Sequence, residues 1–186
     1  DRIATAGSCF AQNIARYLRR SNLTYFEAEP TPAKMPPDVA RRFGYGLYSA
    51  RYGNIYTARQ LRQLIEDTLS GQVREEAIWE RDARFFDALR PGVEPAGLAS
   101  AEEVRAQRRD HLRHLARMLS GMDVFVFTLG LTETWQDLQS GTVFPSAPGV
   151  IAGQFDADRH GFLNQGFTDV LDDMRAALAL LREARP

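Results

Sequence analysis

The stretch that decides the fold is Ile3-Ala4-Thr5-Ala6-Gly7-Ser8-Cys9-Phe10. Its first four residues are apolar or β-branched and predict a short strand, which the glycine and the serine end. After this turn, apolar residues recur at the spacing of one helix face. They are Phe10, Ile14, Ala15 and Leu18. The chain is therefore predicted to begin with a strand, a tight turn and a helix.

Strands and turns continue along the rest of the 186 residues. A second strand is predicted at residues 23–27, and four prolines between residues 30 and 37 predict an irregular loop. The nearly unbroken hydrophobic run at residues 123–129 is typical of a parallel strand covered on both faces. We therefore expect it at the centre of the sheet. A weaker pattern at residues 78–89 predicts a hairpin that closes at Arg90-Pro91-Gly92.

Caps and apolar spacing predict three further helices. Thr57 is a good N-cap for a helix that Gly71 ends. Its apolar face holds Leu61, Leu64, Ile65 and Leu69. Ser100 and Glu103 form a capping-box pattern before a long helix. Its apolar face holds Val104, Leu112, Leu115, Met118 and Leu119. A last amphipathic helix is predicted at residues 169–182.

This alternation of elements predicts one α/β domain over residues 1–186, built as a three-layer α/β/α, doubly wound parallel sheet. In such sheets the ligand site lies beyond the carboxyl ends of the strands. Two predicted strand ends carry unusual polar residues, Gly7-Ser8-Cys9 and Gly130-Leu131-Thr132-Glu133. A strand would normally follow the last helix, so we expect further sequence after Pro186.

Composition argues against several classes of function. Lysine and arginine (23) nearly balance aspartate and glutamate (24), so we expect no nucleic-acid partner. The longest apolar run is far shorter than the roughly 20 residues of a membrane span; we expect no membrane span and, without a recognisable targeting segment, favour the cytoplasm. One cysteine and three histidines show no zinc-site spacing, and we expect no metal or other cofactor. The first turn lacks the motifs of nucleotide-binding loops.

The first turn carries two candidate nucleophiles. Cys9 is expected in the first turn of a helix, where free backbone N–H groups and the helix dipole stabilise a thiolate. Ser8 offers a hydroxyl at the same strand end but needs a neighbouring base. The non-catalytic alternative is that Cys9 is a small buried residue packed against the sheet.

These residues resemble a known family. Gly7-Ser8-Cys9-Phe10-Ala11 is similar to the signature of the GSCFA family, a group similar to the SGNH/GDSL esterases. Further similar blocks follow in the same order: Tyr52-Gly53-Asn54-Ile55-Tyr56-Thr57, Asp87-Ala88-Leu89-Arg90-Pro91 and residues 127–135. The resemblance implies a flavodoxin-like fold of SGNH-hydrolase type. By analogy it also implies acyl-ester or acyl-transfer chemistry on an acylated carbohydrate or small ester.

The resemblance also implies roles for individual residues. Cys9 falls where SGNH enzymes keep their nucleophilic serine, and a similar group of polysaccharide-modifying acyltransferases carries cysteine there. Gly53 and Thr132 fall on the positions of two oxyanion donors, a glycine N–H and an asparagine amide. Thr132 offers only a hydroxyl, which makes Asn54 the candidate that replaces the missing amide.

The general base is the least certain part of the predicted site, because the resemblance places its histidine after Pro186. His111 and His114 lie among arginines on a predicted helix and are expected on a solvated face. His160 is expected in a loop before the last helix, with a structural or surface role rather than a place at the edge of the site. Glu133 is expected to cap a turn or bind an arginine unless it borders the site.

Trp135 is expected in the core rather than in a pocket wall. Without its base, the site also fits a non-catalytic module that binds a glycan or acyl group. The sequence therefore leaves two functions open, an acyl-transferring enzyme and this binding module.

Overall fold

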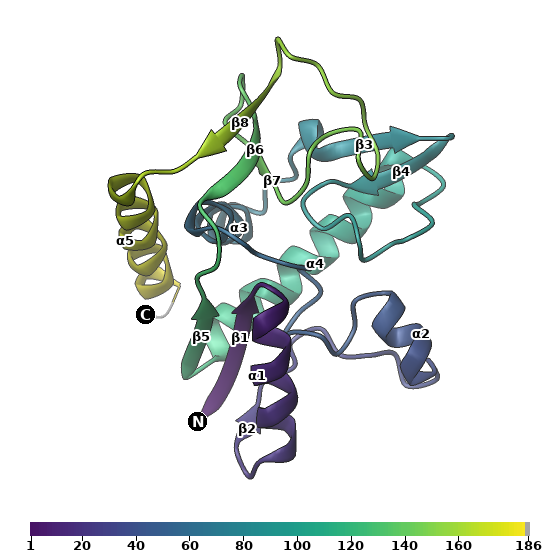
Figure 1. The fold of residues 1–186 in the computed structure, drawn as a ribbon. Helices are drawn as coiled ribbons and strands as arrows, with labels where there is room; N and C mark the ends of the chain where they lie inside the picture. The colour runs from purple at the N-terminus through teal and green to yellow at the C-terminus, as the bar shows by residue number, and fades with distance from the viewer. Residues whose placement is uncertain (185–186) are drawn as a thin grey trace.

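Strand β1 (Arg2–Gly7) lies in the middle of a parallel sheet in the computed structural model, which describes residues 1–184. Strand β2 (Thr24–Tyr25) pairs with one edge of β1, and β5 (Val124–Thr128) pairs with the other. The register of β1 on β5 runs from Ile3 opposite Val124 to Gly7 opposite Thr128. Helices flank this sheet, which makes the fold α/β (Figure 1).

The prediction that the hydrophobic run at 123–129 forms the central strand is wrong for the part of the chain that the structure describes. There β5 pairs only with β1, and Val124 is 41% exposed. The central strand β1 is built from small residues instead, with Ala4, Thr5 and Ala6 at most 1% exposed. Small side chains let helices approach the backbone closely, so burial here follows from size rather than hydrophobicity.

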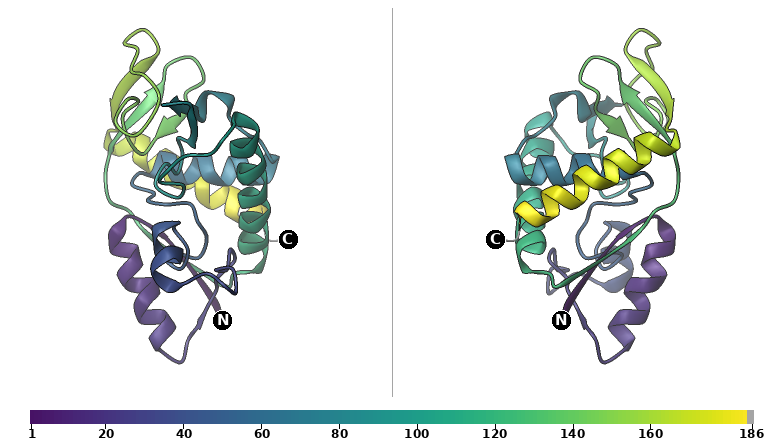
Figure 2. Two further views of the ribbon diagram at one scale, coloured as in Figure 1. Left: turned by 90° about the vertical axis from the view of Figure 1, so that its right-hand side faces the viewer. Right: turned by 90° about the vertical axis from the view of Figure 1, so that its left-hand side faces the viewer.

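The sheet is wound in two directions from β1. Helix α1 (Cys9–Arg20) leads from β1 to β2, whereas α4 (Ala101–Gly121) leads into β5 at the opposite edge. Crossovers between parallel strands are right-handed, so connections that run in opposite directions place their helices on opposite faces. Figure 2 shows α1 and α4 on opposite sides of β1. The winding therefore reverses between β1 and β5, which is the switch point of a doubly wound sheet.

Helix α1 begins at the serine of the first turn. The Oγ of Ser8 accepts a hydrogen bond from the backbone N–H of Phe10 at 3.4 Å, which makes Ser8 the N-cap. The buried face consists of Ala11, Ala15 and Leu18. Phe10 was predicted on that face but is 63% exposed, because the buried stripe begins one residue later.

Helices α3 (Ala58–Ser70) and α4 confirm the predicted caps. Thr57 and Gln60 form a full capping box on α3, and Gly71 ends the helix in the left-handed region. Ser100 caps α4 through the N–H of Glu103 at 3.1 Å. The five apolar residues predicted to pack from α4 are all buried. On α3 the prediction is wrong for Leu69, which is 44% exposed in the last turn.

The predicted hairpin exists, but its turn lies elsewhere. Strands β3 (Ile78–Arg81) and β4 (Arg84–Asp87) follow a 3₁₀ turn at Glu75–Ala77 and pair antiparallel. They are joined by Asp82 and Ala83, which both have positive φ, at 52° and 57°. Two left-handed residues suit the twist of a two-residue hairpin loop. The hairpin therefore closes before Arg90-Pro91-Gly92, not at it.

Several elements were not predicted. A second antiparallel sheet has the order β7-β6-β8. Its strands are β6 (Glu133–Asp137), β7 (Val143–Phe144) and β8 (His160–Asn164). A short helix, α2 (Pro37–Arg42), interrupts the proline-rich loop, with Pro37 in its first turn, where a missing N–H costs nothing.

The last helix, α5 (Phe167–Glu183), lies against α3. The buried carboxylate of Asp173 on α5 accepts hydrogen bonds from Arg59 at 2.7 Å and Arg62 at 3.1 Å on α3. These ion pairs fix the two helices side by side. No helix within residues 1–184 is long and apolar enough to cross a membrane.

The close approach of Gly7 to β5 gives a first testable prediction. A Cβ added at Gly7 would lie 2.1 Å from Thr128 Oγ1 and 2.9 Å from the Thr128 carbonyl oxygen, at a φ of +139°. We expect Gly7→Ala to lower the free energy of unfolding by about 3 kcal/mol, from overpacking and backbone strain together. Urea unfolding measures this change.

Gly92→Ala is the matched control, because its Cβ would meet nothing within 4 Å. Its effect should not exceed about 1 kcal/mol. Equal stability of the two variants would contradict the packing described for Gly7.

Candidate functional site

Three chain segments meet at the switch point. The carbonyl of Gly7 accepts a hydrogen bond from the N–H of Ile55 at 2.9 Å. The carbonyl of Tyr56 accepts from the N–H groups of Gly130 and Leu131, at 3.3 and 2.9 Å. Backbone hydrogen bonds thus join the turn after β1, the segment before α3 and the turn after β5. This arrangement brings together the two polar strand ends that were predicted to form the site.

Ser8 and Cys9 lie at the open side of this junction. A Cβ on Gly130 would lie 3.9 Å from the Oγ of Ser8, so the turn after β5 passes directly beside the serine. Cys9 is the first residue of α1 and is exposed. The alternative that Cys9 is a buried core residue is therefore wrong.

A hydrogen-bond chain orients the side-chain amide of Asn54. Gln12 donates from Nε2 to the hydroxyl oxygen of Tyr48 at 3.0 Å, and the Tyr48 hydroxyl donates to Oδ1 of Asn54. Burial raises the pKa of Tyr48 to about 12, so this hydroxyl keeps its proton. Since the carbonyl side of the Asn54 amide is taken by Tyr48, its NH₂ group is the side left to donate to a ligand.

A pocket of about 250 Å³ opens beside these residues. Gln12, Tyr48, Gly53 and Asn54 line one part of it. Much of the remaining lining is apolar and comes from distant segments: Leu47, Leu89, Pro91, Val93, Pro145 and Ile151. Cavities of this kind, mainly apolar with a few polar groups, are typical of small-molecule sites.

Thr132 and Glu133 do not line the pocket. The hydroxyl of Thr132 donates to Oδ1 of Asn164 at 2.8 Å, where β6 begins beside β8. Both Thr132 and Glu133 are exposed. The oxyanion and binding roles predicted for these two residues stay predictions. Sequence patterns missed Asn164, an amide beside Thr132, because its segment looked like a loop.

The three histidines bind partners other than the two nucleophile candidates. Nδ1 of His111 lies 2.7 Å from Oε2 of Glu29, and Nδ1 of His114 lies 2.8 Å from the carbonyl oxygen of Ala28. His160 lies in β8 rather than in a loop, and its Nδ1 accepts from the N–H of Asp156 at 3.1 Å. Within residues 1–184, no histidine hydrogen bonds to Ser8 or Cys9.

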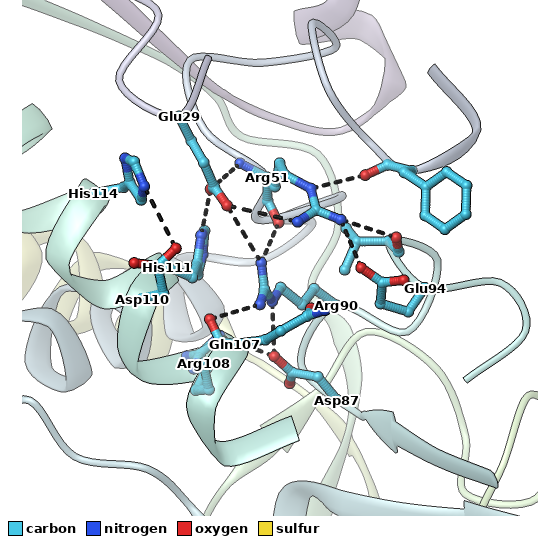
Figure 3. A network of polar contacts seen from close by, with 12 residues as sticks. Glu29, Arg51, Asp87, Arg90, Glu94, Gln107, Arg108, Asp110, His111 and His114 are labelled. Atoms are coloured by element: carbon cyan, nitrogen blue, oxygen red, sulfur yellow. Dashed lines mark hydrogen bonds and ion pairs between the residues drawn. The ribbon is translucent and has the colours of Figure 1, made fainter. Parts of the chain in front are cut away.

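The prediction that His111 lies with arginines on a solvated face of α4 is wrong for the middle of this helix. His111 is fully buried and Arg108 is 3% exposed, because both face a cluster of charged residues from other segments. Figure 3 shows this buried polar network around Arg90. Arg109 and Arg113, on the other side of α4, are exposed.

Arg90 holds one wall of the pocket in place. Its Nε donates to Asp87 at 2.8 Å, and its two terminal nitrogens donate to the carbonyls of Arg51 and Gln107, both at 3.2 Å (Figure 3). Because Leu89 and Pro91 flank Arg90, this anchoring fixes the apolar residues that line the pocket. The block of residues 87–91 noted in the sequence thus has a structural role here.

The network also sets two protonation states. Burial, together with the charge of Arg90, lowers the pKa of His111 to about 3, so His111 is neutral. Burial alone would raise the pKa of Glu29, but the hydrogen bond to His111 and the charges around it lower that pKa to about 2. A neutral His111 therefore donates its Nδ1–H to an ionised Glu29.

The surroundings of Trp135 are aromatic. Trp135 is half-buried and its ring packs edge-on against Phe155 and Phe162. The prediction that Trp135 packs in the core is thus confirmed in part.

Among residues 1–184, no group of three or more histidine, cysteine, aspartate or glutamate side chains could hold a metal ion.

A parallel sheet whose winding reverses at β1, with an exposed cysteine at the reversal, defines a doubly wound α/β protein with a candidate ligand site at its switch point. The GSCFA family model matches residues 2–186, and the chain belongs to the GSCFA family. No curated protein and no solved structure matches the chain. The relationship to SGNH/GDSL esterases therefore stays a prediction.

The neutral state of His111 predicts how stability depends on pH. In the unfolded chain a histidine takes up a proton below about pH 6.5, whereas buried His111 stays neutral down to about pH 3. Unfolding therefore binds one proton in this window. The contribution of His111 alone should lower the free energy of unfolding by about 1.4 kcal/mol per pH unit as the pH drops from about 6 to 4.5.

We expect His111→Gln to reduce this slope, measured by urea unfolding at several pH values. His114→Gln is the control, since it removes a partly exposed histidine three residues further along α4 and leaves buried His111 in place. An unchanged slope in His111→Gln would show that His111 is protonated in the folded protein.

Proposed function

We propose that the protein is an ester hydrolase or acyltransferase of SGNH/GDSL type that acts on an acylated carbohydrate or small ester. The observation that carries this proposal is the exposed thiol of Cys9, at the N-terminus of α1 and at the switch point of the sheet. The N-terminus of a helix presents free backbone N–H groups and the positive end of the helix dipole, which stabilise negative charge that develops there. Ser8, whose Oγ caps the same helix, is the alternative nucleophile.

The proposed reaction has two steps. In the first, the thiolate of Cys9 attacks the ester carbonyl carbon, the C–S bond forms, and the alkoxide leaves and takes up a proton. In the second, water or an acceptor hydroxyl attacks the thioester, loses a proton and releases the Cys9 thiolate. A histidine outside residues 1–184 serves as the base, in line with the SGNH resemblance.

The oxyanion of each step needs hydrogen-bond donors beside Cys9. Asn54 is the side chain best prepared for this role, because Tyr48 occupies its carbonyl oxygen and leaves its NH₂ group to donate. Gly53 and the N–H of Cys9 are the backbone candidates. Thr132 and Glu133 belong in this proposal to the outer part of the substrate site, beside Asn164.

The histidine contacts favour a second candidate function. All three histidines of the chain bind partners other than Ser8 and Cys9 within the described residues. A non-catalytic module that holds a glycan or acyl group in the pocket beside the switch point would need no base. The two functions differ in one chemical product, a covalent acyl group on the protein.

Acylation of Cys9 is the direct test. We expect p-nitrophenyl hexanoate to add one hexanoyl group to the protein, detected by intact-mass spectrometry and mapped to Cys9 by peptide analysis. Cys9→Ala should abolish the adduct. Ser8→Ala should keep it, with stability lowered by about 1 kcal/mol through loss of the helix cap. An adduct on Ser8, or none on the parent protein, would reject Cys9 as the nucleophile.

The role of Asn54 gives a separate prediction. Removing one oxyanion donor typically lowers the rate by about 100- to 1,000-fold, and we expect Asn54→Ala to slow acylation of Cys9 within that range. Tyr48→Phe should slow it less, by about tenfold, because the amide stays but loses the partner that orients it. Stopped-flow release of p-nitrophenolate measures both.

Alkylation of Cys9 by iodoacetamide forms no oxyanion and provides the control reaction. Its rate should be unchanged in both variants. A parallel loss of alkylation would mean that the substitutions disturb the turn itself.

A further inference from the structure

The pocket of about 250 Å³ lies one helical turn from Cys9. Gln12 is three residues after Cys9 on α1, so their side chains lie on the same side of the helix, and Gln12 lines the pocket. Tyr56 also lines it, and its carbonyl binds the turn after β5 that passes beside Ser8. A group attached to the sulfur of Cys9 can therefore extend past Gln12 and Tyr48 into this space.

The size of the pocket is far larger than an acetyl group needs. An apolar cavity of about 150 Å³ in a protein core is enough to bind benzene. The pocket here is about 250 Å³. It has room for an aromatic ring or a chain of several methylenes.

The lining suits an apolar ligand. Each nitrogen of the Arg90 guanidinium donates to Asp87 or to a backbone carbonyl, so this buried group is held mainly by the protein itself. The hydroxyl of Tyr48 is taken by Gln12 and Asn54. The remaining lining residues with polar groups are Arg41, Asn54, Tyr56 and Ser146; Arg41 is exposed to solvent, and the hydroxyl of Ser146 is buried without a partner among the described residues. A sugar ring carries hydroxyls around its whole edge, more than these few groups can pair, and each buried hydroxyl without a partner is costly.

We propose that this pocket binds the acyl part of the substrate and that the acyl group is a medium-length alkyl chain or an aromatic ring. This inference rests on the proposed function, because it places the scissile carbonyl at Cys9. The alcohol or sugar part of the substrate then lies outside the pocket, on the solvent-exposed side of Cys9. Acetyl esters leave most of the pocket unfilled and are poor substrates.

Gly92 is a position in the pocket lining where a side chain can be added without a clash. It lines the pocket, its φ is outside the left-handed region, and a Cβ placed on it would meet nothing within 4 Å. Gly92→Leu therefore adds a bulky side chain to open space. Gly92→Ala is the matched control, with the same backbone change and little added volume.

The test measures alkylation of Cys9 by N-methyl, N-butyl, N-hexyl and N-decyl iodoacetamide, followed by intact-mass spectrometry. Each methylene that is buried in part stabilises the bound reagent enough for a rate gain of about 2- to 2.5-fold. We expect the rate to rise by about 30- to 100-fold from methyl to hexyl and then to level off. Gly92→Leu should reduce this ratio to below about threefold, and Gly92→Ala should keep it.

Phe10 is exposed beside Cys9 and could bind alkyl chains on the surface instead. The chain-length effect should therefore persist in Phe10→Ala. A rate independent of chain length, or a gain that survives Gly92→Leu or disappears in Phe10→Ala, would overturn the pocket assignment.

Alkylation needs no acyl transfer, so the result separates the two proposals. A chain-length effect removed by Gly92→Leu, without any acylation by esters, supports the pocket and rejects the enzyme. Acylation of Cys9 without a chain-length effect supports the enzyme and rejects the pocket assignment.

Discussion

The contact between Gly7 and Thr128 is the constraint on which the rest of the site depends. A side chain at position 7 would overlap the Oγ1 and the backbone of Thr128, so only glycine lets the end of β1 lie against the end of β5. This approach brings the turn that carries Ser8 and Cys9 next to the turn at Gly130. The winding of the sheet reverses at the same place, which leaves the crevice above it free of crossing connections.

Two sets of hydrogen bonds hold the pocket lining in place beside this junction. Gln12, Tyr48 and Asn54 form a chain of side chains whose direction is fixed, because the hydroxyl of Tyr48 keeps its proton. Beneath it, Arg90 is bound on several sides by the charged network around Glu29 and Asp87. Removing one member of such a network leaves buried charges without partners, so the network favours a single geometry for the pocket wall.

Sequence patterns predicted the elements that depend on local rules. Thr57 and Ser100 cap helices as expected, and the position of Cys9 at a helix start follows from the turn before it. Sequence patterns failed where contacts with residues far away in the sequence determine the structure. His111 looks solvated among arginines until Glu29 is brought to it from 82 residues away, and β1 looks weakly hydrophobic because alanine buries little area per residue. The antiparallel sheet was missed because glycines and prolines lie between its short strands.

The central claim is that the turn after β1, the segment at residues 54–56 and the turn after β5 form one rigid junction at the sheet's carboxyl edge. Native-state hydrogen exchange at the backbone amides of Ile55 and Leu131 tests it most directly, since each amide donates across the junction at 2.9 Å. Amides that open only with the core exchange at the rate of global unfolding. Protection of both amides close to that of Ala6 in β1 is the predicted result. Exchange of either amide as fast as in an open loop would contradict the account.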